Sequence, residues 1–179
     1  MKKIFLIFIL AYAFTGMAFA GAFGFQKGMT YDQVKEACGG REPEKIKEGI
    51  YVIVPLKPHP YFTSYIAWID EKEGLNYIKA IGADIETNGY GIEVRSKYDD
   101  LESAISKTYG KCERMDTLMP DSIWDDPKYW MESIENKERY FFTSWTKESG
   151  AMLPKDMVGI YMGICANSSL SGYICLEYE

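Results

Sequence analysis

The sequence predicts an α+β fold of two tandem repeats, each a helix plus a three- to four-stranded antiparallel sheet, forming one unit with the helices on one face. Three observations predict it. Two segments carry apolar residues at helical spacing, four strand-like segments follow each of them, and matching signals occur in the same order in both halves. Neither half can cover its sheet face alone, so we expect the two sheets to join edge to edge or to pack through a shared core, with the other face partly open.

The first predicted helix begins at a capping box. Thr30 caps the helix, and Gln33, three residues later, reaches back to the backbone N–H of Thr30. Apolar residues recur at helical spacing from Tyr31 to Cys38, and Gly39-Gly40 ends the helix in a left-handed cap. Segments rich in β-branched and aromatic residues predict strands at 50–56, 61–69 and 75–81, and a short fourth strand at 91–94.

The second predicted helix begins near Ser96 or Lys97 and ends at Gly110. Its apolar stripe consists of Tyr98, Leu101, Ile105 and Tyr109. Strand-like segments follow at residues 112–118, 139–145, 157–166 and 172–178.

A short helix near 127–136 is predicted as an insertion in the second half. Asp126 is a good N-cap, and Pro127 occupies the first helical position, where its missing N–H costs nothing. Trp130, Met131 and Ile134 are expected to face inward from it.

The two halves resemble each other in sequence. Tyr31-Asp32-x-Val34-x-x-Ala37 matches Tyr98-Asp99-x-Leu101-x-x-Ala104, and later matches follow in the same order at a growing offset. An insertion in the second half explains that growth, so we predict an internal duplication with repeats at 21–94 and 95–179. The alternative is that any two units of a helix plus a meander share such signals by chance.

Residues 1–20 have the pattern of a cleaved signal peptide. Lys2 and Lys3 precede an apolar run at 4–14, and Ala18-Phe19-Ala20 is an A-x-A cleavage signal. No Cys follows the run to accept a lipid. The pattern predicts an unanchored bacterial protein that is periplasmic or secreted, with no membrane insertion after signal removal.

The charge balance excludes two classes of partner. The formal net charge is −6, and loss of Lys2 and Lys3 with the signal makes the chain more negative. Nucleic-acid binding depends on Lys and Arg that displace counterions, and anionic lipid attracts basic segments. The aromatic share is 15%, with Tyr the most frequent, which indicates either cross-strand packing or a contact surface for another protein.

The chain has four cysteines, at Cys38, Cys112, Cys165 and Cys175. In an oxidising compartment an even number predicts two disulfides, with three possible connectivities. Cys165 and Cys175 flank a polar hairpin connection that can bring them together, which leaves Cys38 with Cys112. The alternative is free thiols that pack as small apolar residues. No C-x-x-C or Cys/His cluster predicts a metal, and no cofactor is expected.

One opening motif resembles a known group of proteins. Gly24-Phe25-x-x-Gly28-Met29-Thr30-x-x-Gln33-Val34, followed by Gly39-Gly40, resembles the first helix of small exported bacterial modules. These are the lipoprotein subunit of the outer-membrane β-barrel assembly machine and the β-lactamase-inhibitor-like proteins. The resemblance implies tandem helix-plus-antiparallel-sheet repeats, disulfides, and a protein-binding role without catalysis. The lipid-attachment Cys of the lipoprotein pattern is missing.

No catalytic residue is predicted. His59 is the only histidine and lies between two prolines, so it is either a loop residue or a lone general base. The chain has no G-x-S-x-G motif, and the acids from Asp116 to Asp126 lack EF-hand spacing.

Three aromatic residues in the inserted segment are the candidate binding residues: Trp124, Tyr129 and Trp130. The alternative is that Trp130 and Met131 plug the end of the sheet. An open sheet face with aromatic side chains also suits protein recognition. The sequence therefore favours an exported, non-enzymatic protein-binding or inhibitor-like module, with a carboxylate-based cell-envelope hydrolase or an assembly factor for surface proteins as alternatives.

Overall fold

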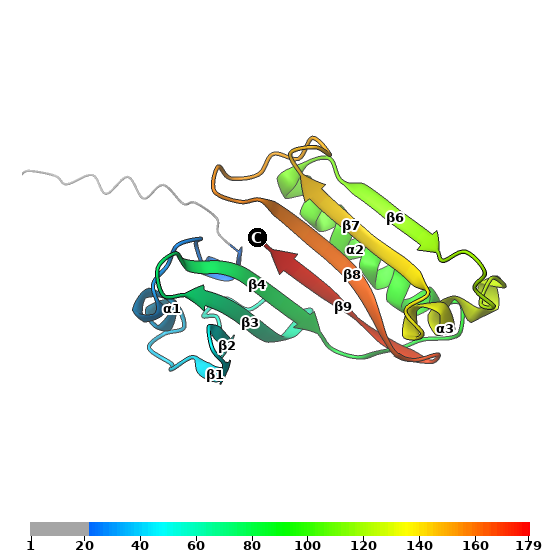
Figure 1. Ribbon diagram of the computed structural model, residues 1–179, viewed down its shortest axis with the longest axis horizontal. Helices are drawn as coiled ribbons and strands as arrows, with labels where there is room; N and C mark the ends of the chain where they lie inside the picture. Colours follow the sequence, from blue (N-terminus) through cyan, green and yellow to red (C-terminus); the bar gives the residue numbers. More distant parts are fainter. Residues whose placement is uncertain (1–21) are drawn as a thin grey trace, which may run out of the picture.

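The computed structural model describes residues 22–179, and the predicted signal peptide at 1–20 lies outside the described residues. Within this range nine strands form one antiparallel sheet in the order β1-β2-β3-β4-β9-β8-β7-β6, and β5 pairs with β9 off this path (Figure 1). The strands are β1 (Glu44–Lys47), β2 (Ile50–Ile53), β3 (Phe62–Asp70), β4 (Gly74–Gly82), β5 (Ile85–Glu86), β6 (Glu113–Leu118), β7 (Arg139–Thr146), β8 (Gly159–Ser168) and β9 (Ser171–Tyr178).

The helical segments are α1 (Tyr31–Ala37), α2 (Ile92–Tyr109) and α3 (Trp130–Glu135), with short 3₁₀ turns η1 (Ala22–Gly24) and η2 (Pro127–Tyr129). The predicted capping box of α1 is confirmed. The N–H of Gln33 donates to Thr30 Oγ1 at 3.3 Å, and the N–H of Thr30 donates to Gln33 Oε1 at 2.9 Å. The Asp126 side chain caps η2, with Pro127 at its start.

The predicted fold class of two tandem helix-plus-sheet repeats is wrong. β4 pairs with β9, so the strands form one large sheet, and the chain is 39% strand but only 23% helix. The physical reason lies in the strand edges. Unpaired N–H and C=O groups on β4 and β9 satisfy each other when the edges meet, and no local sequence signal specifies which edges pair.

The predicted strand at 91–94 is also wrong, because these residues open α2. Gly91 is the N-cap, with a left-handed φ of 68°, and the helix starts at Ile92. A Cβ at Gly91 would lie 2.7 Å from the ring of Trp130. Both the backbone conformation and the close approach of the indole therefore require glycine.

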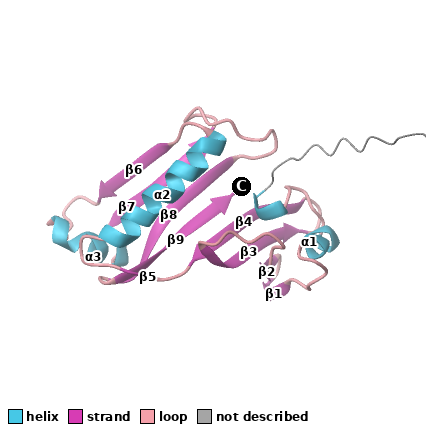
Figure 2. Cartoon of the chain, turned by 180° about the vertical axis from the view of Figure 1, so that it is seen from behind, coloured by secondary structure: helices cyan, strands magenta, loops and turns pink. Residues whose placement is uncertain are grey.

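All three helices pack against the same face of the sheet. Tyr31 of α1 contacts Tyr51 of β2 edge to face, while Tyr98 of α2 and Trp130 of α3 both pack on Phe141 of β7. Strand pairing places the partners of these residues on one side of the sheet. Figure 2 shows α2 lying in front of the strands on this side, and Figure 1 shows the opposite side.

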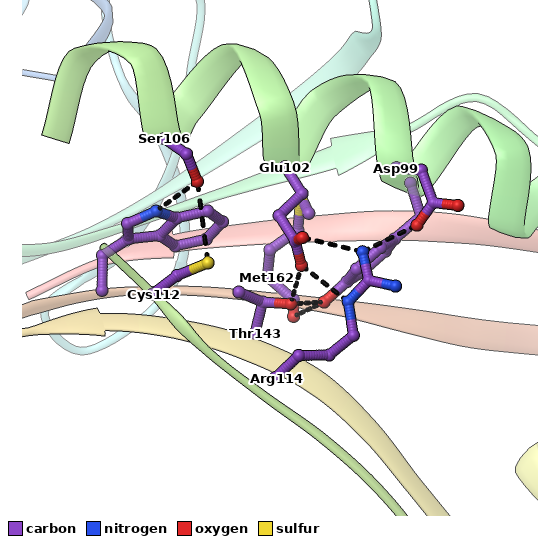
Figure 3. Close-up of polar contacts among 9 residues, drawn as sticks. Asp99, Glu102, Ser106, Cys112, Arg114, Thr143 and Met162 are labelled. Atoms are coloured by element: carbon purple, nitrogen blue, oxygen red, sulfur yellow. Dashed lines mark hydrogen bonds and ion pairs between the residues drawn. The ribbon is translucent and has the colours of Figure 1, made fainter. Parts of the chain in front are cut away.

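A buried polar network fixes α2 to the sheet (Figure 3). The Tyr98 hydroxyl lies 2.8 Å from the carbonyl oxygen of Met162 and 2.7 Å from Oγ1 of Thr143. Thr143 donates in turn to Glu102. The guanidinium of Arg114 donates to Glu102 and Asp99 and offsets part of their negative charge. The helix is thus held by hydrogen bonds as well as by apolar contact.

A second part of the same network lies one turn further along α2. The indole Nε1 of Trp145 donates to Ser106 Oγ at 3.1 Å, and Ser106 donates to Cys112 Sγ at 3.6 Å (Figure 3). Trp145 is fully buried, so this bond satisfies a donor that would otherwise have no partner.

We predict that Tyr98→Phe lowers the free energy of unfolding by about 1–3 kcal/mol, because it leaves buried oxygens without a donor while keeping the ring in place. Urea unfolding measures the change. The matched control is Tyr90→Phe, since Tyr90 is exposed. Equal stabilities of the two variants would show that the network does not hold the helix.

Candidate functional site

The face of the sheet opposite the helices carries side chains aligned by strand register. One row runs through paired residues on seven strands: Val52, Ile66, Lys79, Glu177, Tyr161, Ser144 and Glu113. Figure 1 views this side, from β2 across the β4–β9 pairing to β6. We call it the open face, because α1, α2 and α3 pack on the other side.

A second row lies beside the first on the open face. It consists of Ser64, Ile81, Cys175, Gly163, Phe142 and Met115. Aromatic residues flank the two rows. Trp68 pairs with Tyr77 at one side, and Tyr140 and Tyr173 lie at the other. Trp68 and Tyr140 are 50% and 49% exposed, which is a large amount of apolar surface for side chains within strands.

An ion pair lies at the centre of the first row. Lys79 Nζ of β4 is 2.8 Å from Glu177 Oε1 of β9, and the two side chains are 31% and 29% exposed. Burial disfavours the charged form of Lys79, but the hydrogen bond to Glu177 and the nearby acidic groups outweigh it and raise its pKa above the ordinary lysine value. The pair therefore stays charged and self-neutralised at the middle of the open face.

Two thiols lie in contact beside this ion pair. Cys165 Sγ of β8 is 3.8 Å from Cys175 Sγ of β9. The hydrogen bond from Cys175, together with Tyr173 and Lys79, lowers the pKa of Cys165 against the effect of burial. Cys175 is 5% exposed, and its bond to Cys165 together with burial raises its pKa.

All four cysteines are free thiols in the structure. Cys38 follows α1 and is buried there, while Cys112 accepts a hydrogen bond from Ser106 of α2, so these two lie beneath different helices. The disulfides inferred from the sequence stay predictions. The geometry favours a bond between Cys165 and Cys175 over one between Cys38 and Cys112.

The structure separates the three predicted binding residues. Trp130 is 4% exposed and packs on Phe141, and Met131 is also buried. This burial agrees with the alternative interpretation, in which Trp130 and Met131 plug the end of the sheet. Trp124 and Tyr129 are half-buried and pack edge to face, with centroids 5.6 Å apart. Trp130 therefore lies on the helical side of the sheet, away from the open face. A binding role for them stays a prediction.

The other residues singled out from the sequence have local roles. His59 is partly buried and packs on Tyr61, and burial lowers its pKa. Asp126 accepts the N–H of Lys128 as the cap of η2, and Asp116 pairs with Arg139. Across residues 22–179, no group of three or more His, Cys, Asp or Glu side chains converges in a way that would hold a metal ion.

A cavity at the β4–β9 pairing is not predicted by any sequence pattern. It has a volume of about 300 Å³ and is lined by residues of four separate segments, among them Phe25, Leu75, Ile78, Met157 and Tyr178. Ile78 and Tyr178 pair in register on the side of the helices, and Tyr77 of the open face also lines the cavity. Among the helices described, none has the length and apolar character needed to cross a membrane.

Comparison with known proteins gives no relative: no family model, no curated protein and no solved structure matches this chain.

We predict that Lys79 and Glu177 stabilise each other by about 1 kcal/mol in a double-mutant cycle of Lys79→Met and Glu177→Gln. The control cycle is the exposed pair of Lys45 and Glu48, for which about 0.3 kcal/mol or less is expected. Because the pKa of Lys79 is raised on folding, the contribution is fully present up to about pH 10.4, the ordinary lysine value, and is lost above it. Equal coupling energies for the Lys79–Glu177 and Lys45–Glu48 pairs would contradict the prediction that Lys79 and Glu177 stabilise each other more than an exposed pair does.

Proposed function

We propose that this chain is an exported, non-enzymatic protein that binds another protein through the open face of its sheet. One observation carries the proposal. Two register-matched rows of side chains, flanked by half-exposed aromatic residues, cross the sheet on the side that no described helix covers. The signal pattern at 1–20 supports export, and the resemblance to inhibitor-like modules agrees with a binding role.

The size of the open face favours a protein over a small molecule. Adjacent strands lie about 4.8 Å apart, so a row from β2 to β6 spans about 29 Å. A small ligand binds in an enclosed pocket, whereas a stable protein interface covers about 800 Å² on each partner. A broad surface of this width matches a protein interface rather than an enclosed pocket for a small ligand.

The residue types on the open face are those of an interface core. Tyr, Trp, Phe and Met are enriched at such cores, and unpaired charges are depleted. Trp68, Tyr140 and Tyr161 are large rings held on rigid strands, so they lose little conformational entropy on binding. The central charges of Lys79 and Glu177 neutralise each other and need no counter-charge from the partner.

The hydrolase alternative needs two carboxylates free to act on a substrate. Asp99 and Glu102 converge, but both are held by Arg114, at 2.7 and 2.8 Å from its Nη2. The acidic residues that line the cavity at the β4–β9 pairing are instead Asp156 and Glu179. The Glu179 backbone bonds to Val158 and Gly159 beside it. An assembly factor for surface proteins would use the same open face, so the test below covers that alternative as well.

The test compares capture of cell-envelope proteins by immobilised wild-type protein and by two variants. We expect Trp68→Ala/Tyr140→Ala to bind the captured partner about 30-fold more weakly, because anchor residues of this kind contribute about 2 kcal/mol or more. The control Ile92→Ala removes an equally exposed apolar side chain from α2 and should bind like wild type.

Equal binding by the face variant and the wild type would overturn the proposal, as would repeated failure to capture any partner under several growth conditions. Circular dichroism of each variant separates loss of binding from loss of fold.

A further inference from the structure

We propose that Cys165 and Cys175 form a thiol–disulfide exchange site that reacts with small disulfides of the glutathione type, with Cys165 as the attacking thiol and Cys175 as the resolving thiol. The inference rests on the contact between the two sulfurs and on their unequal exposure. It does not depend on the proposed binding of a partner protein.

Strand register places the two side chains on the same face of adjacent strands. Cys165 pairs with Tyr173, and Cys175 pairs with Gly163, so the cysteines are diagonal neighbours in the β8–β9 ladder. Gly163 presents no side chain opposite Cys175. The sulfurs are already in contact at 3.8 Å, and a disulfide requires them to close to about 2.05 Å.

Exposure assigns the two roles. Cys165 is half-buried, whereas Cys175 is 5% exposed, so a small disulfide in solution reaches Cys165 more readily than Cys175. The groups that face the pair are Tyr173, Lys79 and Glu177. The bond from Cys175, with Tyr173 and Lys79, lowers the pKa of Cys165 and so increases its thiolate fraction at neutral pH.

The reaction proceeds in two exchanges. The thiolate of Cys165 attacks one sulfur of the small disulfide, the S–S bond breaks, and one small thiolate leaves. Cys175 then loses its proton and attacks Cys165 Sγ, and the second small thiolate leaves as the internal disulfide forms. Two protein thiols are oxidised, one small disulfide is reduced to two thiols, and the protons pass to the departing thiolates.

The other two cysteines do not form such a pair. Cys38 is 1% exposed, and burial raises its pKa, so it is both hidden and mostly protonated. Cys112 bonds to Ser106 beneath α2. A variant with both replaced, Cys38→Ser/Cys112→Ser, therefore isolates the chemistry of the remaining two thiols.

The test exposes reduced protein on this background to oxidised glutathione and follows its intact mass. With both thiols present, we expect loss of two hydrogen atoms and a linked peptide joining Cys165 to Cys175. Adding Cys175→Ser should trap one glutathione on Cys165. Adding Cys165→Ser should slow glutathione addition at least about tenfold, because the remaining thiol is buried.

Three results would overturn the proposal. The Cys38→Ser/Cys112→Ser protein could keep two alkylatable thiols, or it could stop at a glutathione adduct. The third result is an equal rate of glutathione addition in the two single-thiol variants. Wild-type protein gives an independent check that requires no substitution. Substoichiometric iodoacetamide should label Cys165 ahead of Cys175, and the reverse order would contradict the assigned roles.

Discussion

The pairing of β4 with β9 is the interaction on which the rest of the structure depends. Residues 78–81 pair with residues 175–178, and this short ladder joins the strands of the first half to those of the second. On one side of the ladder Ile78 and Tyr178 border the cavity, and on the other Lys79 and Glu177 form an ion pair. Without this pairing neither row of the open face would cross the molecule.

The two faces of the sheet differ because alternate side chains of each strand point to opposite faces. On β9, Ile174 and Leu176 are buried toward the helices, whereas Tyr173 and Glu177 point to the open face. The buried side gains hydrogen bonds from α2 through Tyr98 as well as apolar contact. The open side keeps Trp68 and Tyr140 about half exposed to solvent.

Local features of the fold could be predicted from the sequence, and long-range ones could not. The capping box at Thr30 and the apolar stripe of α2 depend on residues within a few positions, so their spacing is readable. The sequence pattern predicts a strand at 91–94, because a glycine before β-branched residues fits a strand as well as a helix N-cap. Joining of the two sheets is one of the expectations from the sequence, but the choice of β4 and β9 as the paired edges is not, because residues almost a hundred positions apart carry no mutual signal.

The candidate site likewise has one feature that could be predicted from the sequence and one that could not. The Cys165–Cys175 contact could be anticipated, because a polar turn between two apolar runs predicts a hairpin. The aromatic residues of the open face could not be separated from core aromatics such as Trp130, since side-chain type does not tell which face of a sheet or helix lacks a neighbour. That information exists only once the order of the strands is known.

Native-state amide hydrogen exchange tests the continuous sheet most directly. The account predicts that the paired amides of residues 78–81 and 175–178 exchange as slowly as those at the centres of β3 and β8, because all belong to one cooperative unit. Rapid exchange at the β4–β9 pairing, with slow exchange persisting in each half, would show two separate sheets and would remove the basis for a shared open face.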